Sequence, residues 1–497
     1  MLLKTLMPYL VIGTLLAAVF AGVSLSVKID SSSPVVTITS PTSSQTYVTS
    51  DKTLTIGGMV TDDTGIGGMN WSNKNSGDSG SVSQLPSASG NWNINSIPLL
   101  EGPNVITIKA WDKAGNSNMK AIKVILDTGN PSCMILTPTN GPKMATSSST
   151  VNMTGFSSDK YGVVSVKWYN TANLATGTAF GTGSWSITDL PLRAGYNDIQ
   201  IKALDNAGNV GIAKINISYD FQIPDCDIIL PTSASTYFTS WNVTGLSGTA
   251  SDNLGVTKVM CTNAANGDER LANGTLNWNI SMPLDVGANL ITVTAYDASN
   301  NTKSDNITVT YDPTSPTLAI TSPTASINYL TNASTVTLGG TASDNIAVTY
   351  INWTNKLSSS SGSVTVAASW SITAIPLSIG INHIVVMVTD AAGNSVQDFI
   401  NVTRDSTKPI CTITVPGGNK TYVATPTIDI SGTATDAAGV VSVTWSSNRT
   451  GSGTATGTTS WSVLGINLDL GSNMLTVIAW DAAGNAGVQY LKVIRTA

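Results

Sequence analysis

Aspartates at three recurring positions are the residues of this chain best suited to chemistry. One Asp stands four residues before a recurring proline, a second stands four residues after a glycine, and a third opens an Asp-x-x-x-Asn segment. Of the 28 aspartates (30 acidic residues less Glu101 and Glu269), fifteen occupy these positions. They are Asp30, Asp127, Asp220, Asp312 and Asp405; Asp62, Asp159, Asp252, Asp344 and Asp436; and Asp112, Asp205, Asp297, Asp390 and Asp481.

Three carboxylates gathered at one place repel one another unless a cation neutralises them. Ca²⁺ prefers six to eight oxygen ligands at a flexible site, so each triad is predicted to bind calcium. The alternative is that each Asp only caps its own turn, because Asp favours turns through local hydrogen bonds. The Asp before the proline lies in a linker with no turn to cap, which favours the metal. Both interpretations stay open at this point.

Other kinds of chemistry are poorly represented. A single histidine, His383, excludes His-based catalytic triads and multi-His metal sites. Only Glu101 and Glu269 are available for paired-glutamate acid–base catalysis. We therefore expect a non-enzymatic protein without catalytic residues and without a cofactor besides calcium. The net charge of −6 leaves no basic surface for nucleic acid.

The four cysteines suggest packing rather than metal binding. Cys133, Cys226 and Cys411 each stand two residues after the recurring proline, where buried small residues are expected. Cys226 and Cys261 fall in the same repeat at positions that point inward. In an exported protein this pair is a disulfide candidate, and two buried thiols are the alternative.

The elements that must position these residues belong to five copies of one unit. The opening prolines recur about every 93 residues, a repeat that defines the architecture. Each copy contains a Gly-x-x-x-Asp segment, expected to be a turn, and runs that alternate polar and apolar residues. Two tryptophan positions, as at Trp445 and Trp461, fall on the inward phase of such runs and are expected in the core.

About seven short strands per copy predict a β-sandwich of the immunoglobulin (Ig) type. The fold class is therefore all-β, with five tandem Ig-like domains in a linear array. In such a sandwich the first strand begins at the pole that carries the second–third and the last hairpin loops, so each triad is expected to gather there. The predicted domains are residues 30–127, 128–220, 221–312, 313–405 and 406–497.

The amino terminus predicts export. Residues 1–27 contain an apolar run from Leu6 to Val27, which suits a signal peptide cleaved after Ala21. The alternative is an uncleaved membrane anchor, because the run is long enough to cross a bilayer. Either way the repeats are expected outside the cell or at its surface, with membrane contact only through residues 6–27.

The order Pro-x-Val-x-Ile, Gly-Thr-Ala-x-Asp, Val-x-Trp and Asp-x-Ala-Gly-Asn resembles tandem bacterial Ig-like repeats of secreted and surface proteins. It is similar to hyalin-type repeats and to the Ig-like arrays of adhesins. This resemblance implies a stalk or adhesion role, and some adhesin arrays are stiffened by calcium between domains.

The expected function is therefore an exported, non-enzymatic stalk or adhesion protein. Its partner would be a cell-surface or matrix protein or a glycan. Two alternatives remain: an accessory polysaccharide-binding protein of a secreted hydrolase system, and a self-assembling filament subunit. Exposed aromatic rows would favour the first, and an open edge strand would favour the second.

Overall fold

The computed structural model describes residues 29–497, so the predicted signal or anchor segment lies outside the described residues. Those residues form strands and loops without any α-helix, and hence contain no helix able to span a membrane. The chain divides into two compact units, Met1–Phe221 and Gln222–Ala497, which hold two and three domains respectively.

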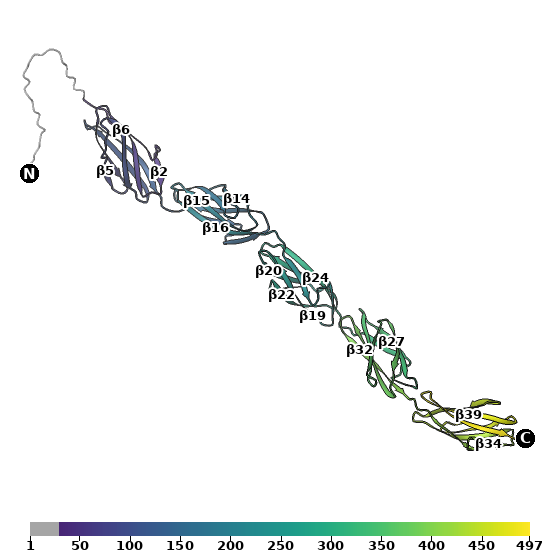
Figure 1. Ribbon diagram of the computed structural model, residues 1–497. Helices are drawn as coiled ribbons and strands as arrows, with labels where there is room; N and C mark the ends of the chain where they lie inside the picture. The colour runs from purple at the N-terminus through teal and green to yellow at the C-terminus, as the bar shows by residue number, and fades with distance from the viewer. Residues whose placement is uncertain (1–28) are drawn as a thin grey trace, which may run out of the picture. The chain divides into compact units, whose positions relative to one another are not determined.

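Each domain is a sandwich of a three-stranded and a five-stranded sheet (Figure 1). In domain 1 the small sheet has the order β1-β3-β6 and the large sheet the order β2-β8-β7-β4-β5. Its strands are β1 (Val35–Ser40), β2 (Thr46–Thr49), β3 (Thr53–Thr61), β4 (Ile66–Asn73), β5 (Ser79–Ser81), β6 (Ser89–Pro98), β7 (Gly102–Asp112) and β8 (Ser117–Leu126).

The same eight strands in the same order form the other domains, which confirms the prediction of five Ig-like sandwiches. Domain 2 has β9 (Ser132–Thr137), β10 (Lys143–Thr146), β11 (Thr150–Ser158), β12 (Val163–Asn170), β13 (Thr176–Thr178), β14 (Ser184–Pro191), β15 (Gly195–Asp205) and β16 (Val210–Tyr219). Domain 3 has β17 (Asp225–Leu230), β18 (Thr236–Thr239), β19 (Val243–Ser251), β20 (Val256–Asn263), β21 (Asp268–Leu271), β22 (Asn277–Pro283), β23 (Gly287–Asp297) and β24 (Thr302–Tyr311). Domain 4 has β25 (Thr317–Ser322), β26 (Asn328–Thr331), β27 (Thr335–Ser343), β28 (Val348–Asn355), β29 (Ser360–Val364), β30 (Ser369–Pro376), β31 (Gly380–Asp390) and β32 (Ser395–Arg404). Domain 5 has β33 (Ile410–Val415), β34 (Lys420–Val423), β35 (Thr427–Thr435), β36 (Val440–Ser447), β37 (Gly451–Thr454), β38 (Ser460–Asn467), β39 (Gly471–Asp481) and β40 (Ala486–Arg495).

Eight strands replace the expected seven because the first strand is divided between the sheets. In domain 1, β1 pairs antiparallel with β3, and β2 pairs in parallel with β8 of the other sheet. Pro41 follows β1 directly and has no N–H with which to continue the ladder, so the chain leaves one sheet and joins the other. A proline occupies the corresponding position in every domain.

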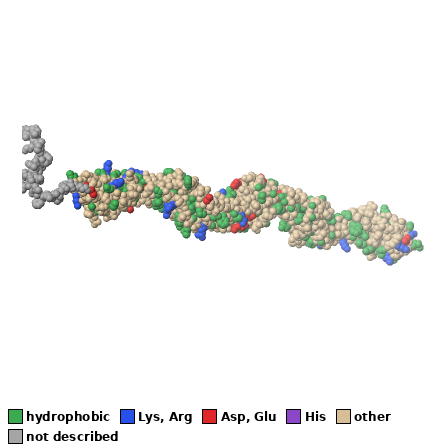
Figure 2. All heavy atoms as spheres, turned by 90° about the horizontal axis from the view of Figure 1, so that it is seen from above, with side chains coloured by type: hydrophobic (Ala, Val, Ile, Leu, Met, Phe, Trp, Pro, Cys, Tyr) green, Lys and Arg blue, Asp and Glu red, His purple; other side chains and the backbone are tan. Residues whose placement is uncertain are grey.

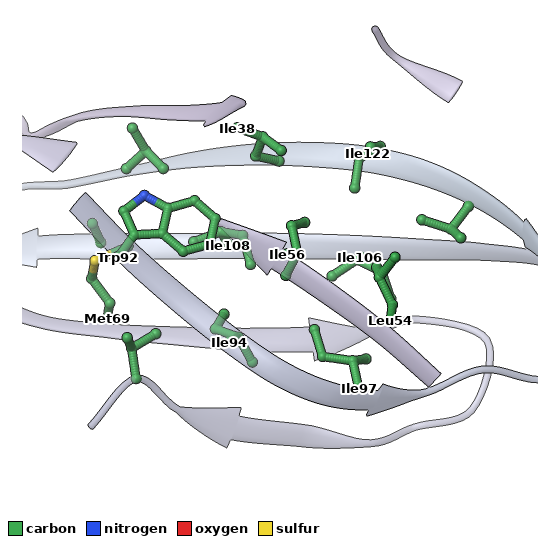
Figure 3. Close-up of a cluster of buried hydrophobic side chains, with 14 of the residues drawn as sticks. Ile38, Leu54, Ile56, Met69, Trp92, Ile94, Ile97, Ile106, Ile108 and Ile122 are labelled. Atoms are coloured by element: carbon green, nitrogen blue, oxygen red, sulfur yellow. The ribbon is translucent and has the colours of Figure 1, made fainter. Parts of the chain in front are cut away.

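The predicted core tryptophans separate into two classes. Trp92 packs among isoleucines between the two sheets of domain 1 (Figure 3). It and its counterparts Trp185, Trp278, Trp370 and Trp461 are between 1% and 4% exposed, as expected for the core. Trp71, Trp168, Trp353 and Trp445 are only half-buried, although they pack against the core. They lie on the strand next to the edge strand of the five-stranded sheet, such as β4 beside β5 in domain 1.

The glycine of the Gly-x-x-x-Asp segment lies within a strand, so the predicted turn begins only at the Asp. In domain 3, Gly248 pairs with Trp278 on one side and with Ile228 on the other. A Cβ at Gly248 would lie 1.9 Å from the Asp227 carbonyl oxygen and 2.5 Å from Trp278 Cζ2. The glycine is therefore required by the close approach of an indole ring and a neighbouring strand.

Uncharged side chains dominate the visible face of the described residues (Figure 2). On the face drawn in Figure 2, lysine, arginine, aspartate and glutamate side chains are few and scattered. This agrees with the low charged fraction of 11%. Clusters of charge are therefore informative wherever they occur.

The contact of Gly248 with Trp278 gives a first prediction. Gly248→Ala should destabilise domain 3 by about 1–3 kcal/mol, the usual cost of overpacking a core. Gly245→Ala, on the same strand but with open space around its Cβ, is the matched control. Urea-dependent labelling of Cys226 and Cys261, both buried in domain 3, reports the unfolding of this domain. Equal urea midpoints for the two variants would contradict the packing role of the glycine.

Candidate metal centres

The structure brings three aspartates together at one pole of domain 2. Asp127 follows the last strand of domain 1, Asp159 follows β11, and Asp205 ends β15. One carboxylate oxygen from each lies within 4.8 Å of the others. The same spacing holds for Asp312, Asp344 and Asp390, and for Asp405, Asp436 and Asp481. A fourth predicted triad is divided between the units, with Asp220 in the first and Asp252 and Asp297 in the second.

Backbone hydrogen bonds hold the linker aspartate on both sides. The Asp127 N–H donates to the Thr49 carbonyl of domain 1 at 2.9 Å, and Asn209 Nδ2 of domain 2 donates to the Asp127 carbonyl at 2.9 Å. Asp312 and Asp405 make the corresponding bonds to a threonine before them and to an asparagine after them. The linker Asp is thus fixed to the preceding domain while its carboxylate lies in the following one.

The asparagine that ends the Asp-x-x-x-Asn segment orients the third aspartate. Asn209 donates its N–H to Asp205 Oδ1 and its Nδ2 to Asp205 Oδ2, each at 2.8 Å. This role was not predicted from the sequence, although the asparagine recurs in all five repeats. The equivalent asparagines of the other domains also donate their N–H and Nδ2 to the two oxygens of the third aspartate. They are Asn116, Asn301, Asn394 and Asn485.

Turn capping accounts for one oxygen of Asp127, Asp312 and Asp344 and leaves the second oxygen of each without a hydrogen-bond partner. Asp127 Oδ1 accepts the Gly129 N–H at 3.1 Å, and Asp344 Oδ2 accepts the Ile346 N–H at 2.8 Å. Asp127 Oδ2, Asp312 Oδ2 and Asp344 Oδ1 are buried and accept no hydrogen bond. Asp127 and Asp312 are only 3% and 1% exposed. Buried polar atoms are normally paired, so these oxygens are suited to a bound cation.

The electrostatics agree with this interpretation. Burial raises the pKa of the Asp127 carboxyl, and the nearby charges of Asp159, Asp205 and Glu101 raise it further. A charged carboxylate is therefore disfavoured at this place when nothing neutralises it. A divalent cation would remove both penalties at once.

The residues fit calcium. Two oxygens bound to one Ca²⁺ at about 2.3–2.6 Å are separated by at most about 5 Å, which the observed spacing satisfies. Every side-chain donor is a carboxylate, the hard oxygen ligand that Ca²⁺ prefers, and backbone carbonyls and water would complete its shell. Asp127, Asp159 and Asp205 would hold the ion in domain 2, and the two other undivided triads would do so in domains 4 and 5.

The first triad differs from the sequence-based prediction. In domain 1 the oxygens of Asp30, Asp62 and Asp63 form the group within 4.8 Å, and Asp112 is not part of it. Asp30 is only half-buried, and hydrogen bonds from Thr64 and Ser32 lower the pKa of its carboxyl to about 2. No described domain precedes Asp30 to bury it. Its carboxylate is therefore already satisfied by hydroxyl donors.

All four cysteines are free thiols in the structure. Cys226 on β17 and Cys261 on β20 come from opposite sheets and share the core of domain 3. Burial raises the pKa of Cys226 to about 11 and that of Cys261 to about 12. Thiols held this far from ionisation are weak nucleophiles, which disfavours disulfide exchange while the domain stays folded.

Two family models match parts of the chain. Residues 409–477, in domain 5, match a bacterial Ig domain, and residues 316–406, in domain 4, match glucodextranase, domain B. The comparison with curated proteins gives no match.

Several solved structures match this chain at low sequence identity and low TM-score. A tetra-tandem repeat from the extending region of a large adhesion protein is 22% identical, with 75% of this chain and 100% of that chain covered and a TM-score of 0.28. A bacterial ice-binding adhesin is 19% identical, with 55% and 98% covered and a TM-score of 0.27. The fibronectin(III)-like modules of Clostridium thermocellum CbhA are 17% identical, with 36% and 94% covered and a TM-score of 0.27. At these TM-scores no functional argument rests on the likeness.

The raised pKa of Asp127 gives a second prediction. When folding raises the pKa of a carboxyl group, the protonated group stabilises the folded state. This stabilisation is complete below the usual aspartate pKa and is lost as the pH rises through the raised pKa. In chelator at pH 7, Asp127→Asn should therefore stabilise domain 2, because the amide bears no charge and donates to the neighbouring carboxylates. Amide exchange in β11 and β12 should slow by roughly two- to fivefold, and the difference should shrink near pH 4.

Asp198→Asn removes the same charge from the same domain outside the triad and is the control. Wild type and variant are compared at equal pH, so the intrinsic pH dependence of exchange cancels. A variant that exchanges faster than wild type at pH 7 would contradict the assigned charge repulsion.

The cysteine environments give a third prediction. In the folded full-length chain, an alkylating reagent should label the half-exposed Cys133 first, while Cys226 and Cys261 stay protected until domain 3 unfolds. Peptide mapping by mass spectrometry without reduction measures both the labels and any cross-link. A peptide joined through Cys226 and Cys261 would instead establish the disulfide that the sequence suggested.

Proposed function

We propose that this tandem array of bacterial Ig-like domains is an exported, non-enzymatic stalk at the cell surface, in which calcium bound at Asp127, Asp312 and Asp405 couples a domain to the one before it. The observation that carries the proposal is the pair of buried, unpaired oxygens of Asp312 and Asp344 in one triad. Asp312 belongs to the linker and Asp344 to the domain that follows. A cation shared by both would bind the linker to that domain.

Calcium would act on the junction through linkage. An ion that binds only the assembled triad stabilises it by about 2.7 kcal/mol when its concentration is one hundred times the dissociation constant. The linker would then lose freedom relative to the following domain, and the orientation of neighbouring domains would depend on the ion concentration. Extracellular modules bind Ca²⁺ with dissociation constants of about 10⁻⁴ to 10⁻³ M, in the range where such dependence matters.

The stalk role rests on the architecture. Five copies of one sandwich, of which domains 2, 4 and 5 carry the same triad of aspartates, suit a spacer whose length is set by repeat number. The bacterial Ig domain matched by residues 409–477 supports this role. Ig-like modules of this kind are commonly non-catalytic, and a function must still be argued from particular sites.

A second candidate function is an accessory role in polysaccharide breakdown. It is favoured by the match of residues 316–406 to domain B of glucodextranase, an accessory domain of an enzyme family. Under that role, domain 4 would bind a glucan and a separate catalytic partner would cleave it. Retention of the chain on insoluble α-glucan, lost when domain 4 alone is deleted, would favour this candidate over the stalk.

The calcium proposal gives the fourth prediction. Calcium added to the chelator-treated full chain should raise the urea midpoint at which Cys411, buried in domain 5, becomes labelled. Asp405→Asn should remove most of that rise, which is expected to equal about 1–3 kcal/mol at saturating calcium. Isothermal titration should show one site fewer for Asp405→Asn and for Asp344→Asn, each counted against wild type.

Asp285→Asn, an exposed aspartate outside every triad, is the matched control and should keep both the midpoint and the stoichiometry. Magnesium should substitute poorly, because it requires near-ideal octahedral geometry and gives up water reluctantly. Identical Cys411 labelling curves in calcium and in chelator would reject the metal and leave the aspartates as turn caps.

A further inference from the structure

Domain 2 differs from the other four domains around its edge strand β13. Three of its side chains there are large or charged, namely Lys167 and Tyr169 on β12 and Phe180 just after β13. The strand registers identify the equivalent residues in the other domains. Lys167 corresponds to Asn70, Met260, Asn352 and Thr444. Tyr169 corresponds to Ser72, Thr262, Thr354 and Ser446. Phe180 corresponds to Ser83, Asn273, Thr365 and Thr456.

Phe180 places an aromatic ring in solvent on a fixed backbone. Its side chain is 86% exposed. Its N–H and carbonyl both bond to Ser186 of the neighbouring strand, at 2.8 and 2.9 Å, so the residue is not part of a loose loop. The other domains have a small polar residue at this position. Exposed aromatic rings on rigid elements are characteristic of binding surfaces.

Trp168 on β12 adds a second aromatic ring, which is half-buried and lies opposite Gly177 of β13. The indole packs over Gly177, where a Cβ would lie 2.6 Å from Trp168 Cε2. Gly177 thus lets the ring lie flat across the edge strand. Trp168 is packed against the core on one side and lines surface hollows on the other.

Two hollows flank the edge strand. One, of about 450 Å³, is lined by Lys167, Tyr169 and Lys202 together with Thr176 and Thr178. The other, of about 490 Å³, is lined by Trp168, Phe180, Ser186, Ile187 and Thr188. Trp168, Gly177 and Thr178 line both hollows. The residues lining them combine aromatic rings, hydroxyls and two lysines, and none of them is acidic.

We infer that the two hollows beside β13 of domain 2 bind an acidic polysaccharide. The flat, apolar C–H faces of sugar rings match the faces of Trp168 and Phe180, and sugar hydroxyls match the threonines and serine. Lys167 and Lys202 supply the positive charge that a carboxylate or sulfate group requires, in a chain whose net charge is −6. An extended polymer with repeated rings fits two adjoining hollows, whereas a single small ligand would fill one.

This inference goes beyond the calcium-coupled stalk and does not depend on it. The hollows contain none of the triad aspartates. They also lie in domain 2, outside the region matched to glucodextranase domain B. The site would make domain 2 the adhesive domain among four spacer domains.

The test is affinity electrophoresis of the full chain through gels that contain alginate, dextran sulfate or neutral dextran. Wild type should be retarded by at least one acidic polymer and much less by neutral dextran, and the retardation should fall as salt rises toward about 0.5 M. A variant with Lys167→Asn, Tyr169→Thr and Phe180→Thr carries residues found at the same positions in other domains, so its fold is preserved. It should bind the acidic polymer roughly tenfold more weakly.

The control variant carries Lys143→Asn and Tyr196→Thr, changes of the same kind elsewhere on domain 2, and should bind like wild type. Equal retardation of the triple variant and wild type would overturn the inference. So would equal retardation by neutral and acidic polymers, or the absence of retardation by any of them. The gels are also run in chelator: binding that disappears there would overturn the assignment to β13, since the sugar would then be held through calcium.

Discussion

A buried carboxylate oxygen that accepts no hydrogen bond is the constraint on which the organisation of this protein depends. Asp127 and Asp312 are held in place by backbone bonds to both adjacent domains, so neither can turn its charge toward water. Leaving such an oxygen unpaired costs free energy that folding must supply elsewhere. The same geometry makes the pole receptive to a cation. In the proposed calcium-bound state, the electrostatic penalty at Asp127 and Asp312 would become a means of joining consecutive domains.

The sequence was sufficient for the fold because the pattern recurs five times. Alternation, turn residues and the spacing of prolines and tryptophans identified the sandwich, and known Ig topology placed the aspartates of three triads together. The finer departures come from contacts that periodicity does not encode. Gly248 was assigned to a turn because glycine favours turns, yet the indole of Trp278 requires it within a strand. Asn209 was visible as a recurring residue, but its two bonds to Asp205 depend on the closed shape of the hairpin loop.

Differences among the repeats were harder to predict than their common features. Asp30 occupies the same register as Asp127 but has no described domain before it, so it is only half-buried and accepts hydrogen bonds from hydroxyls. Phe180 stands out only after the strand registers have aligned it with serine, asparagine and threonine in the other domains. Duplication keeps the residues that every copy needs to fold. Positions free of that requirement are where one copy can acquire a separate role.

The division of the first strand has a mechanical consequence. In domain 1, β2 lies near the start of the domain and pairs in parallel with β8 at its end, in the register Thr46 with Lys123 through Thr49 with Leu126. A tensile force that pulls the two ends of the domain apart acts along these strands in opposite directions. The hydrogen bonds between them are then loaded in shear and must break together rather than one after another. The short parallel ladder therefore acts as a clamp that resists extension, and every domain contains one.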